Sequence, residues 1–128
     1  MENEIKVGEY IRDNKGFIFK VAEIDFDEEA NQNYYKGSEI CSGCFQEMIK
    51  KHSLNIIDLI EKGDYVNGQK ITKITLDPFI KGQIDLWTDR TIPFGHDYEQ
   101  ERFIENEIET IVTKELMERL SYKVERSE

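Results

Sequence analysis

The stretch Lys51–Gly68 reads Lys-His-Ser-Leu-Asn-Ile-Ile-Asp-Leu-Ile-Glu-Lys-Gly-Asp-Tyr-Val-Asn-Gly, and it carries the signals of a short helix followed by a β-hairpin. Asn55 is a typical N-cap residue, and the Asp58 carboxylate can accept hydrogen bonds from free backbone N–H groups of the first turn. Gly63 suits the C-terminal end, because glycine readily adopts the left-handed C′ conformation. We therefore predict a short helix near residues 55–61, whose buried face consists of Ile56, Ile57, Leu59 and Ile60.

The end of this stretch predicts a tight hairpin, and an earlier segment repeats its pattern. Asn67-Gly68 favours a type I′ turn, whose twist matches that of paired strands. The preceding residues Gly63-Asp64-Tyr65-Val66 show the same order of residue types as Gly8-Glu9-Tyr10-Ile11. We interpret residues 5–26 and 60–76 as a pseudo-repeat, in which one local structure, a strand entering a hairpin, is used twice.

Aromatic and β-branched residues at period two predict several further strands. The apolar positions of residues 70–76 break strict alternation, which indicates either a β-bulge or a strand covered on both faces. Residues 40–51 fit helix and strand spacing alike, and we assign them to a strand. Residues 88–106 contain Pro93 and Gly95 among many charges. We predict that they form a long variable loop, a place where binding residues of small β domains tend to lie.

The C-terminal part predicts a strand, a short helix and a closing strand. Thr113 can cap a helix over residues 114–120 after a strand over residues 108–112. Tyr122–Val124 has the composition of a final strand. The inward-facing residues of the helix are predicted to be Leu116, Met117 and Leu120. Because this order resembles the closure of small Src-homology-like barrels, we expect one mainly β domain over residues 1–128, built on one or two partly open barrels of this type.

The composition limits the classes of partner and compartment. The chain has 27 acidic and 17 basic residues and a formal net charge of −10, so its field disfavours binding to a phosphate backbone. The acid excess either keeps the protein soluble or imitates nucleic acid for a basic groove on a partner. No apolar run approaches the ~20 residues of a membrane span, and the N-terminus lacks the features of a signal peptide. We expect a protein of the bacterial host cytoplasm.

Cys41-Ser-Gly-Cys44 is a candidate metal-binding motif. Together with His52 and His96 it could form a zinc site that uses every cysteine and histidine of the chain. The gap before His52 and the remote position of His96 both lie outside common zinc-finger spacings. We therefore expect reduced thiols or a disulfide here, and no metal or cofactor.

The start of the predicted helix is a candidate ligand site. His52, Ser53 and Asn55 bring polar side chains to a place where free N–H donors suit an anion such as a phosphate. The alternative is structural, because Ser53 and Asn55 are also preferred capping residues.

A second candidate ligand site lies around the predicted long loop. Trp87, Arg90 and Arg102 combine an aromatic face with cations, which suits the base and phosphate of a nucleotide. Alternatively, Trp87 belongs to the core and the arginines pair with nearby acids. The sequence contains no nucleophile elbow, phosphate loop or dinucleotide fingerprint, so we expect a protein without enzymatic activity.

The chain resembles small proteins of phages and prophages in Gram-positive bacteria. The residues that carry the resemblance are Lys51–Gly68, Ile111–Glu115 with Tyr122–Val124, and the Val-Gly-Glu-Tyr start of the first strand. Cys41–Cys44 and residues 88–106 are departures from this likeness. The resemblance supplies no activity to carry over, but it implies an accessory phage protein, a class whose members often inhibit host defences.

Three functional hypotheses follow. The first is a non-enzymatic protein that sequesters a small nucleotide signal of host immunity, using the two candidate ligand sites across a homo-oligomer interface. The second is a protein inhibitor, acting as an acidic nucleic-acid mimic, of a host nuclease such as a CRISPR effector. The third is a structural or assembly module of the phage particle or its replication machinery.

Overall fold

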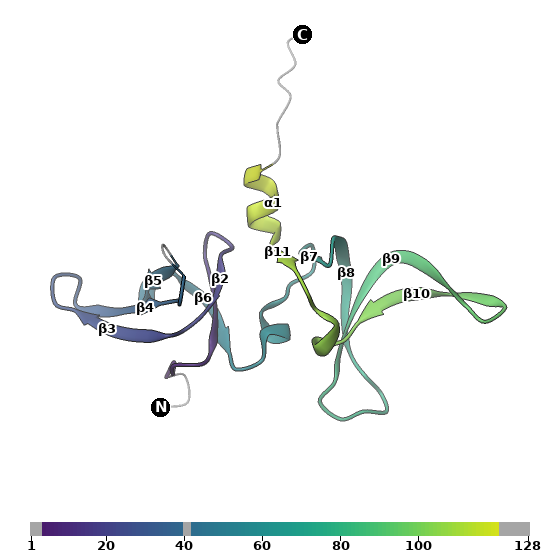
Figure 1. The fold of residues 1–128 in the computed structure, drawn as a ribbon, viewed down its shortest axis with the longest axis horizontal. Coiled ribbons are helices and arrows are strands. Elements are labelled where there is room, and N and C mark those ends of the chain that lie inside the picture. The colour runs from purple at the N-terminus through teal and green to yellow at the C-terminus, as the bar shows by residue number, and fades with distance from the viewer. Residues whose placement is uncertain (1–3, 40–41, 121–128) are drawn as a thin grey trace, which may run out of the picture.

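Short strands joined by tight turns make up most of the computed structural model, which describes residues 4–39 and 42–120 (Figure 1). The prediction of a mainly β fold is confirmed, whereas the expected strand at Tyr122–Val124 lies outside the described residues. The first elements are β1 (Tyr10–Asp13), β2 (Ile18–Lys20), β3 (Glu23–Asp27), β4 (Gln32–Lys36), β5 (Gly43–Phe45), η1 (Gln46–Met48), β6 (Ile49–Ser53) and η2 (Ile56–Leu59). They are followed by β7 (Tyr65–Val66), β8 (Gln69–Leu76), β9 (Ile84–Phe94), β10 (Asp97–Phe103), η3 (Glu105–Glu107), β11 (Ile111–Val112) and α1 (Lys114–Leu120).

The described strands form three antiparallel sheets that remain open. Their strand orders are β2-β1-β6, β3-β4-β5 and β10-β9-β8-β7-β11. The first two belong to an N-terminal half, residues 4–53, and the third to a C-terminal half, residues 57–120. Figure 1 shows the two halves side by side, with η2 and α1 between them. No helix in the described part of the chain has the length and apolar character needed to cross a membrane.

Each half has its own hydrophobic core. Strand alternation points one set of side chains inward in each half, where their burial stabilises the sheets. The N-terminal core consists of Ile5, Ile11, Val21, Tyr35 and Cys44. The C-terminal core consists of Ile57, Ile60, Val66, Ile71 and Leu86. Because η2 supplies Ile57 to the C-terminal core, the connection between the halves is itself packed.

The two Gly-acid-Tyr segments have the same local structure. Gly8 and Gly63 both have φ of +99°, a backbone conformation that favours glycine. In each segment the glycine N–H donates to a backbone carbonyl on the far arm of the hairpin. The acid bonds back to the residue three positions earlier through both its N–H and its carboxylate. In the first segment the contacts are Gly8 N to Val21 O (2.9 Å), Glu9 N to Lys6 O (3.1 Å) and Lys6 N to Glu9 Oε2 (2.6 Å). In the second they are Gly63 N to Ile71 O (2.8 Å), Asp64 N to Glu61 O (3.0 Å) and Glu61 N to Asp64 Oδ2 (2.7 Å).

The Asn67-Gly68 turn has the predicted type I′ conformation and an additional structural role. Asn67 and Gly68 have φ of +52° and +81°. The Asn67 side chain accepts hydrogen bonds from Glu109 N (2.7 Å) and Thr110 N (3.0 Å) and donates one to Glu107 O (2.8 Å). This residue therefore fixes the segment that leads into β11 as well as its own hairpin.

Replacing Asn67 with alanine is expected to lower the free energy of unfolding by about 2 kcal/mol, because it removes three hydrogen bonds and because alanine adopts positive φ less readily than asparagine. Urea denaturation of the variant measures this loss. Glycine adopts positive φ without strain, so Asn67→Gly should lose only the part of the free energy of unfolding that comes from the hydrogen bonds. Equal stability of Asn67→Ala and the unaltered protein would contradict the proposed structural role.

Several local predictions are wrong in detail. Residues 88–106 form most of the β9–β10 hairpin and η3, not a long irregular loop. Residues 43–53 divide into β5, η1 and β6 instead of one strand. The predicted helix near residues 55–61 is a 3₁₀ turn that ends at Leu59, so Gly63 starts the β7 turn and is not a helix cap. Leu120 is 78% exposed and does not face inward.

The predicted β-bulge is confirmed, because the β8–β9 register shifts between Ile71 and Lys73.

Candidate binding pocket

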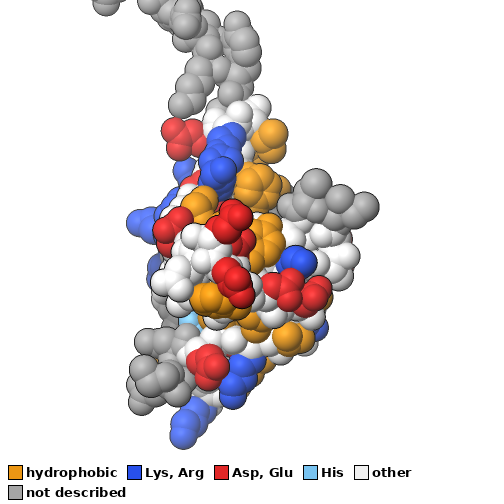
Figure 2. All heavy atoms as spheres, turned by 90° about the vertical axis from the view of Figure 1, so that its left-hand side faces the viewer, with side chains coloured by type: hydrophobic (Ala, Val, Ile, Leu, Met, Phe, Trp, Pro, Cys, Tyr) orange, Lys and Arg blue, Asp and Glu red, His pale blue; other side chains and the backbone are white. Residues whose placement is uncertain are grey.

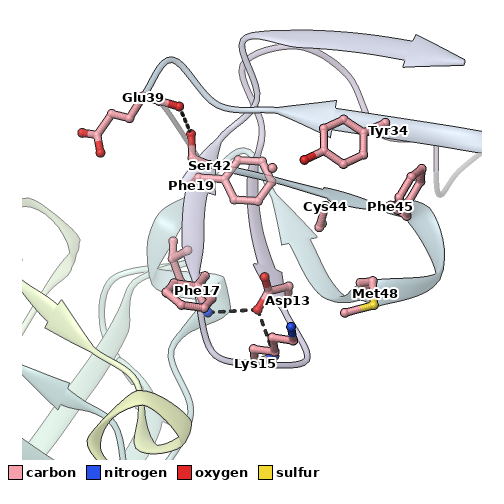
Figure 3. A pocket seen from close by; sticks show the side chains of 12 residues that line it. Asp13, Lys15, Phe17, Phe19, Tyr34, Glu39, Ser42, Cys44, Phe45 and Met48 are labelled. Carbon is pink, nitrogen blue, oxygen red and sulfur yellow. Dashed lines mark hydrogen bonds between the residues drawn. The ribbon is translucent and has the colours of Figure 1, made fainter. Parts of the chain in front are cut away.

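A hollow in the N-terminal half, which we call the aromatic pocket, is the candidate functional site (Figure 3). Its volume is about 540 Å³, within the range of ~300–1,000 Å³ that is typical of ligand sites. The β1–β2 turn forms one wall and β4 with β5 forms the other. The residues that line it are Asp13, Lys15, Phe17, Ile18, Phe19, Tyr34, Glu39, Ser42, Gly43, Cys44, Phe45 and Met48.

Asp13 fixes the turn that carries Phe17 into the pocket. Its Oδ1 accepts hydrogen bonds from Lys15 N (2.9 Å) and Phe17 N (3.0 Å), and Asp13 is only 5% exposed. This is an Asx-type turn, in which the carboxylate replaces backbone acceptors. Phe17 is nevertheless 49% exposed. The aromatic ring is therefore presented to the opening by a rigid turn.

The opposite wall depends on close packing of Tyr34 against Phe45 and Gly43. The rings of Tyr34 and Phe45 meet edge to face, with centroids 4.9 Å apart. A β-carbon at Gly43 would lie 2.8 Å from both Tyr34 Oη and Tyr35 O. Only glycine at position 43 leaves room for Tyr34, so the shape of this wall requires a residue without a side chain there.

Cys44 is part of the pocket wall, and its thiol is protonated and unreactive at neutral pH. Its side chain is buried, and burial together with the charge of Asp13 raises the pKa of the thiol to about 11. A protonated thiol is a poor nucleophile and a poor metal ligand. The pocket thus provides apolar and aromatic surface with carboxylates and one lysine, a composition that suits binding.

Directly behind the pocket turn, Arg12 connects the two halves of the molecule. Arg12 is fully buried and donates to Leu59 O (2.9 Å), to both oxygens of Asp64 and to Glu115. Burial alone would lower its pKa, but the hydrogen bonds and charges of Asp64 and Glu115, with the charge of Glu61, raise it. We call Arg12, Glu61, Asp64 and Glu115 the junction cluster.

Lysines complete the charge balance of this cluster. Glu61 lies 3.0 Å from Lys50 Nζ, 3.4 Å from Lys51 Nζ and 2.9 Å from Lys114 Nζ. Burial raises the pKa of Glu61, but the hydrogen bonds of Lys114 and Lys50 and the charges of Arg12 and Lys51 outweigh it and lower the pKa to about 2. The carboxylate is therefore held ionised.

The junction also touches the pocket turn directly. Thr113, which directly precedes α1, donates a hydrogen bond through Oγ1 to Gly16 O (2.7 Å), and Gly16 lies between Lys15 and Phe17. The first turn of α1 thus holds the back of the pocket wall.

The predicted residues around the helix start lie together but are occupied by structural contacts. His52 Nδ1 is 2.9 Å from Glu9 Oε1. Ser53 Oγ donates to Asp58 Oδ2 (2.6 Å) and accepts from Asn55 N (3.1 Å). Asn55 precedes η2 in an extended conformation, and its side chain makes no capping bond. Here Ser53, and not Asn55, is the residue that organises the turn.

Trp87, Arg90 and Arg102 belong to the C-terminal half. Trp87 Nε1 donates to Thr75 Oγ1 (2.8 Å), and its ring lies 5.7 Å from the Arg102 guanidinium. Arg102 also pairs with Asp85 at 3.2 Å, while Arg90 is exposed on β9. The structure brings Trp87 and Arg102 together, but they lie in a different half from His52 and Ser53 (Figure 1).

The four residues of the considered zinc site do not converge as far as they are described. Cys41 lies outside the described residues, and His96 lies in the turn between β9 and β10, at the far tip of the hairpin (Figure 1). Cys44 belongs to β5 in the opposite half. In the described ranges, no three histidine, cysteine, aspartate or glutamate side chains are grouped as metal ligands.

Sequence reasoning missed the aromatic pocket as a site. The spacing of Phe17, Phe19 and Phe45 indicates only strands, and their common opening depends on contacts between distant segments. Comparison with protein-family models, with curated proteins and with solved structures finds no match for this chain.

Proposed function

We propose that this chain is a non-enzymatic binding protein whose aromatic pocket takes a cationic or apolar side chain of a protein partner. The observation that carries the proposal is the open ring-lined hollow, whose lining includes two acids, the buried Asp13 and Glu39. Aromatic faces and carboxylates both attract cations. The pocket contributes one ammonium group, from Lys15, so its charge favours a basic partner over an acidic one.

The surroundings of the pocket support the same class of partner. Figure 2, which views the N-terminal half end-on, shows acidic side chains next to exposed hydrophobic ones. A net charge of −10 increases the encounter rate with a basic surface. We infer that both halves are open relatives of the Src-homology-like barrel. The resemblance to small phage proteins suggests an accessory role in which binding inhibits a defence protein of the infected bacterium.

Sequestration of a nucleotide signal is the second candidate function. The observation that favours it is the set of aromatic rings around Phe17 and Tyr34, on which a base could stack, with Lys15 available for one phosphate. The predicted site at Trp87 supports it less, because Lys73 and Arg102 already lie 5.6 and 5.7 Å from that ring.

The test uses small probes that represent the two classes of ligand. Phenethylamine and N-acetyl-arginine amide represent partner side chains, and cyclic dinucleotides and ADP-ribose represent nucleotide signals. We expect the amines to shift the NMR resonances of Phe17, Tyr34 and Phe45, with dissociation constants on the order of 1 mM for such small probes. Shifts by the nucleotides, with the ligand released intact on denaturation, would favour the second function.

Phe17→Ala tests whether the pocket itself binds. Because Phe17 is half-exposed, its truncation should leave folding intact while weakening amine binding about tenfold, the loss of ~1.4 kcal/mol of ring contact. Phe26→Ala is the matched control, since Phe26 is 59% exposed in the same half and does not line the pocket. Equal amine binding by both variants and the unaltered protein would overturn the pocket assignment.

A further inference from the structure

Strand β10 leaves one edge of the five-stranded sheet without a partner among the described residues. Among the described strands the order ends at β10, which pairs only with β9. Asp97, Tyr98, Glu99 and Gln100 are all exposed. Figure 1 shows the β9–β10 hairpin extending away from the rest of the molecule. A free edge of this kind presents backbone N–H and C=O groups to which another strand can bind.

The side chains of this edge are arranged in an acidic stripe. Asp97 and Glu99 alternate along the regular part of β10, so their side chains point to one face, spaced by about 6.7 Å, and Glu101 follows where the β9–β10 register shifts. In the described part of the chain neither Asp97 nor Glu99 forms an ion pair, while Glu101 is half-buried and accepts a hydrogen bond from Thr88 Oγ1 (3.2 Å). The two outer carboxylates are therefore free to bind a cation.

Exposed apolar residues lie on both faces of the same hairpin. Phe94, which is 67% exposed, is the register partner of Asp97 and shares its face. Tyr98, which is 74% exposed, points to the other face. Exposed aromatic residues next to an open edge are the anchors that strand addition uses for specificity.

The charges of the stripe determine which kind of strand can pair with the free edge of β10. If a second copy added its own β10 in antiparallel fashion, Glu99 would face Glu99 of the other copy when the pair is centred on Glu99, and Asp97 when it is centred on Tyr98. Like charges directly opposite one another destabilise a sheet. A strand with lysine or arginine at alternate positions would instead place a cation opposite each exposed carboxylate. Charge complementarity therefore favours a basic segment over a second copy.

We propose that the outer edge of β10 binds an extended lysine- or arginine-rich segment of a protein partner as an added strand. The basic side chains of that segment face Asp97 and Glu99, and its alternate apolar side chains contact Tyr98. This surface is separate from the aromatic pocket, since it belongs to the other half of the molecule.

The experiment uses the full chain and an extended peptide of alternating lysine and valine. Calorimetry should show binding that weakens with added salt, and hydrogen exchange should show protection of the amides of β10 on peptide addition. A peptide of alternating glutamate and valine should not bind. Binding without protection of β10, or concentration-dependent self-association of the protein through β10, would overturn the proposal.

Charge reversal separates the stripe from the general negative field. Asp97→Lys with Glu99→Lys should weaken binding of the lysine peptide at least about tenfold. The matched control is Glu28→Lys with Glu29→Lys, which makes the same change of net charge in the exposed β3–β4 turn and should weaken binding less than about threefold. Equal losses in the two double variants would show non-specific attraction and overturn the proposal. Shifts of the Phe17 and Tyr34 resonances on amine addition report the aromatic pocket, whereas amide protection of β10 reports the edge, so failure of the pocket and failure of this edge can be told apart.

Discussion

Replacing Arg12 with methionine is expected to lower the free energy of unfolding by about 3–5 kcal/mol, because it leaves buried carboxylates without their partner. Arg12 and Asp64 both have fully buried side chains, and Arg12 also bonds to Glu115 and to Leu59 O. For a chain of 128 residues this loss corresponds to a fall in Tm of about 10–20 °C. Thermal and urea denaturation measure it.

Two further variants test whether burial is the cause. Lys36→Met removes an ion pair of 2.9 Å with Asp25, whose partners are 46% and 48% exposed, and should change stability by less than about 1 kcal/mol. Arg12→Lys keeps the charge but loses the planar fork that contacts both oxygens of Asp64, so an intermediate loss is expected. If Arg12→Met were as stable as Lys36→Met, the junction cluster would not hold the halves together.

The pseudo-repeat explains how this cluster is built. In the first copy the acid Glu9 contacts His52 of its own half, at 2.9 Å. In the second copy the acid Asp64 contacts Arg12, which belongs to the first half. One local structure therefore serves twice, once within a half and once between the halves. The same turn that starts a hairpin also supplies the carboxylate that joins the two cores.

Most of the local fold could be predicted because turn chemistry is local. Asn67-Gly68 and the repeated glycine-acid-tyrosine order each specify a backbone conformation within a few residues, and the structure has both. Residues 88–106 were misread because proline and glycine usually interrupt strands. Pro93 is accommodated because β8 pairs with β9 only between Ile84 and Thr88, so the outer part of β9 has one neighbouring strand and can lack an N–H.

The candidate site could not be predicted in the same way. Phe17 and Phe45 lie far apart in the chain, and their spacing within each segment indicates only a strand. Arg12 carries no sequence signal either, since its partners Asp64 and Glu115 are more than 50 positions away. Such contacts depend on how the sheets pack against one another. Hydrophobic periodicity and turn residues do not specify this packing.

The junction cluster should also make stability depend on acid pH through Glu61. The pKa of this carboxyl group is about 2 in the folded protein and near 4.5 in an unfolded chain. Because the folded state favours the carboxylate, the stabilisation is fully present above about pH 5 and is lost as the pH falls toward 2. Glu9 and Glu115 also have lowered pKa values and add to the loss of stability in acid.

Glu61→Gln isolates the contribution of this one group. At pH 7 the variant should be less stable than the unaltered protein by about 3 kcal/mol, because each pKa unit corresponds to about 1.4 kcal/mol. The difference should shrink as the pH falls below 5 and vanish near pH 2, where Glu61 itself becomes protonated. Urea denaturation at a series of pH values measures both curves. Glu29→Gln, in the exposed β3–β4 turn, is the control and should follow the unaltered protein at every pH. A pH-independent gap between Glu61→Gln and the unaltered protein would mean that Glu61 stabilises by packing, and that the lysines around it contribute little as charges.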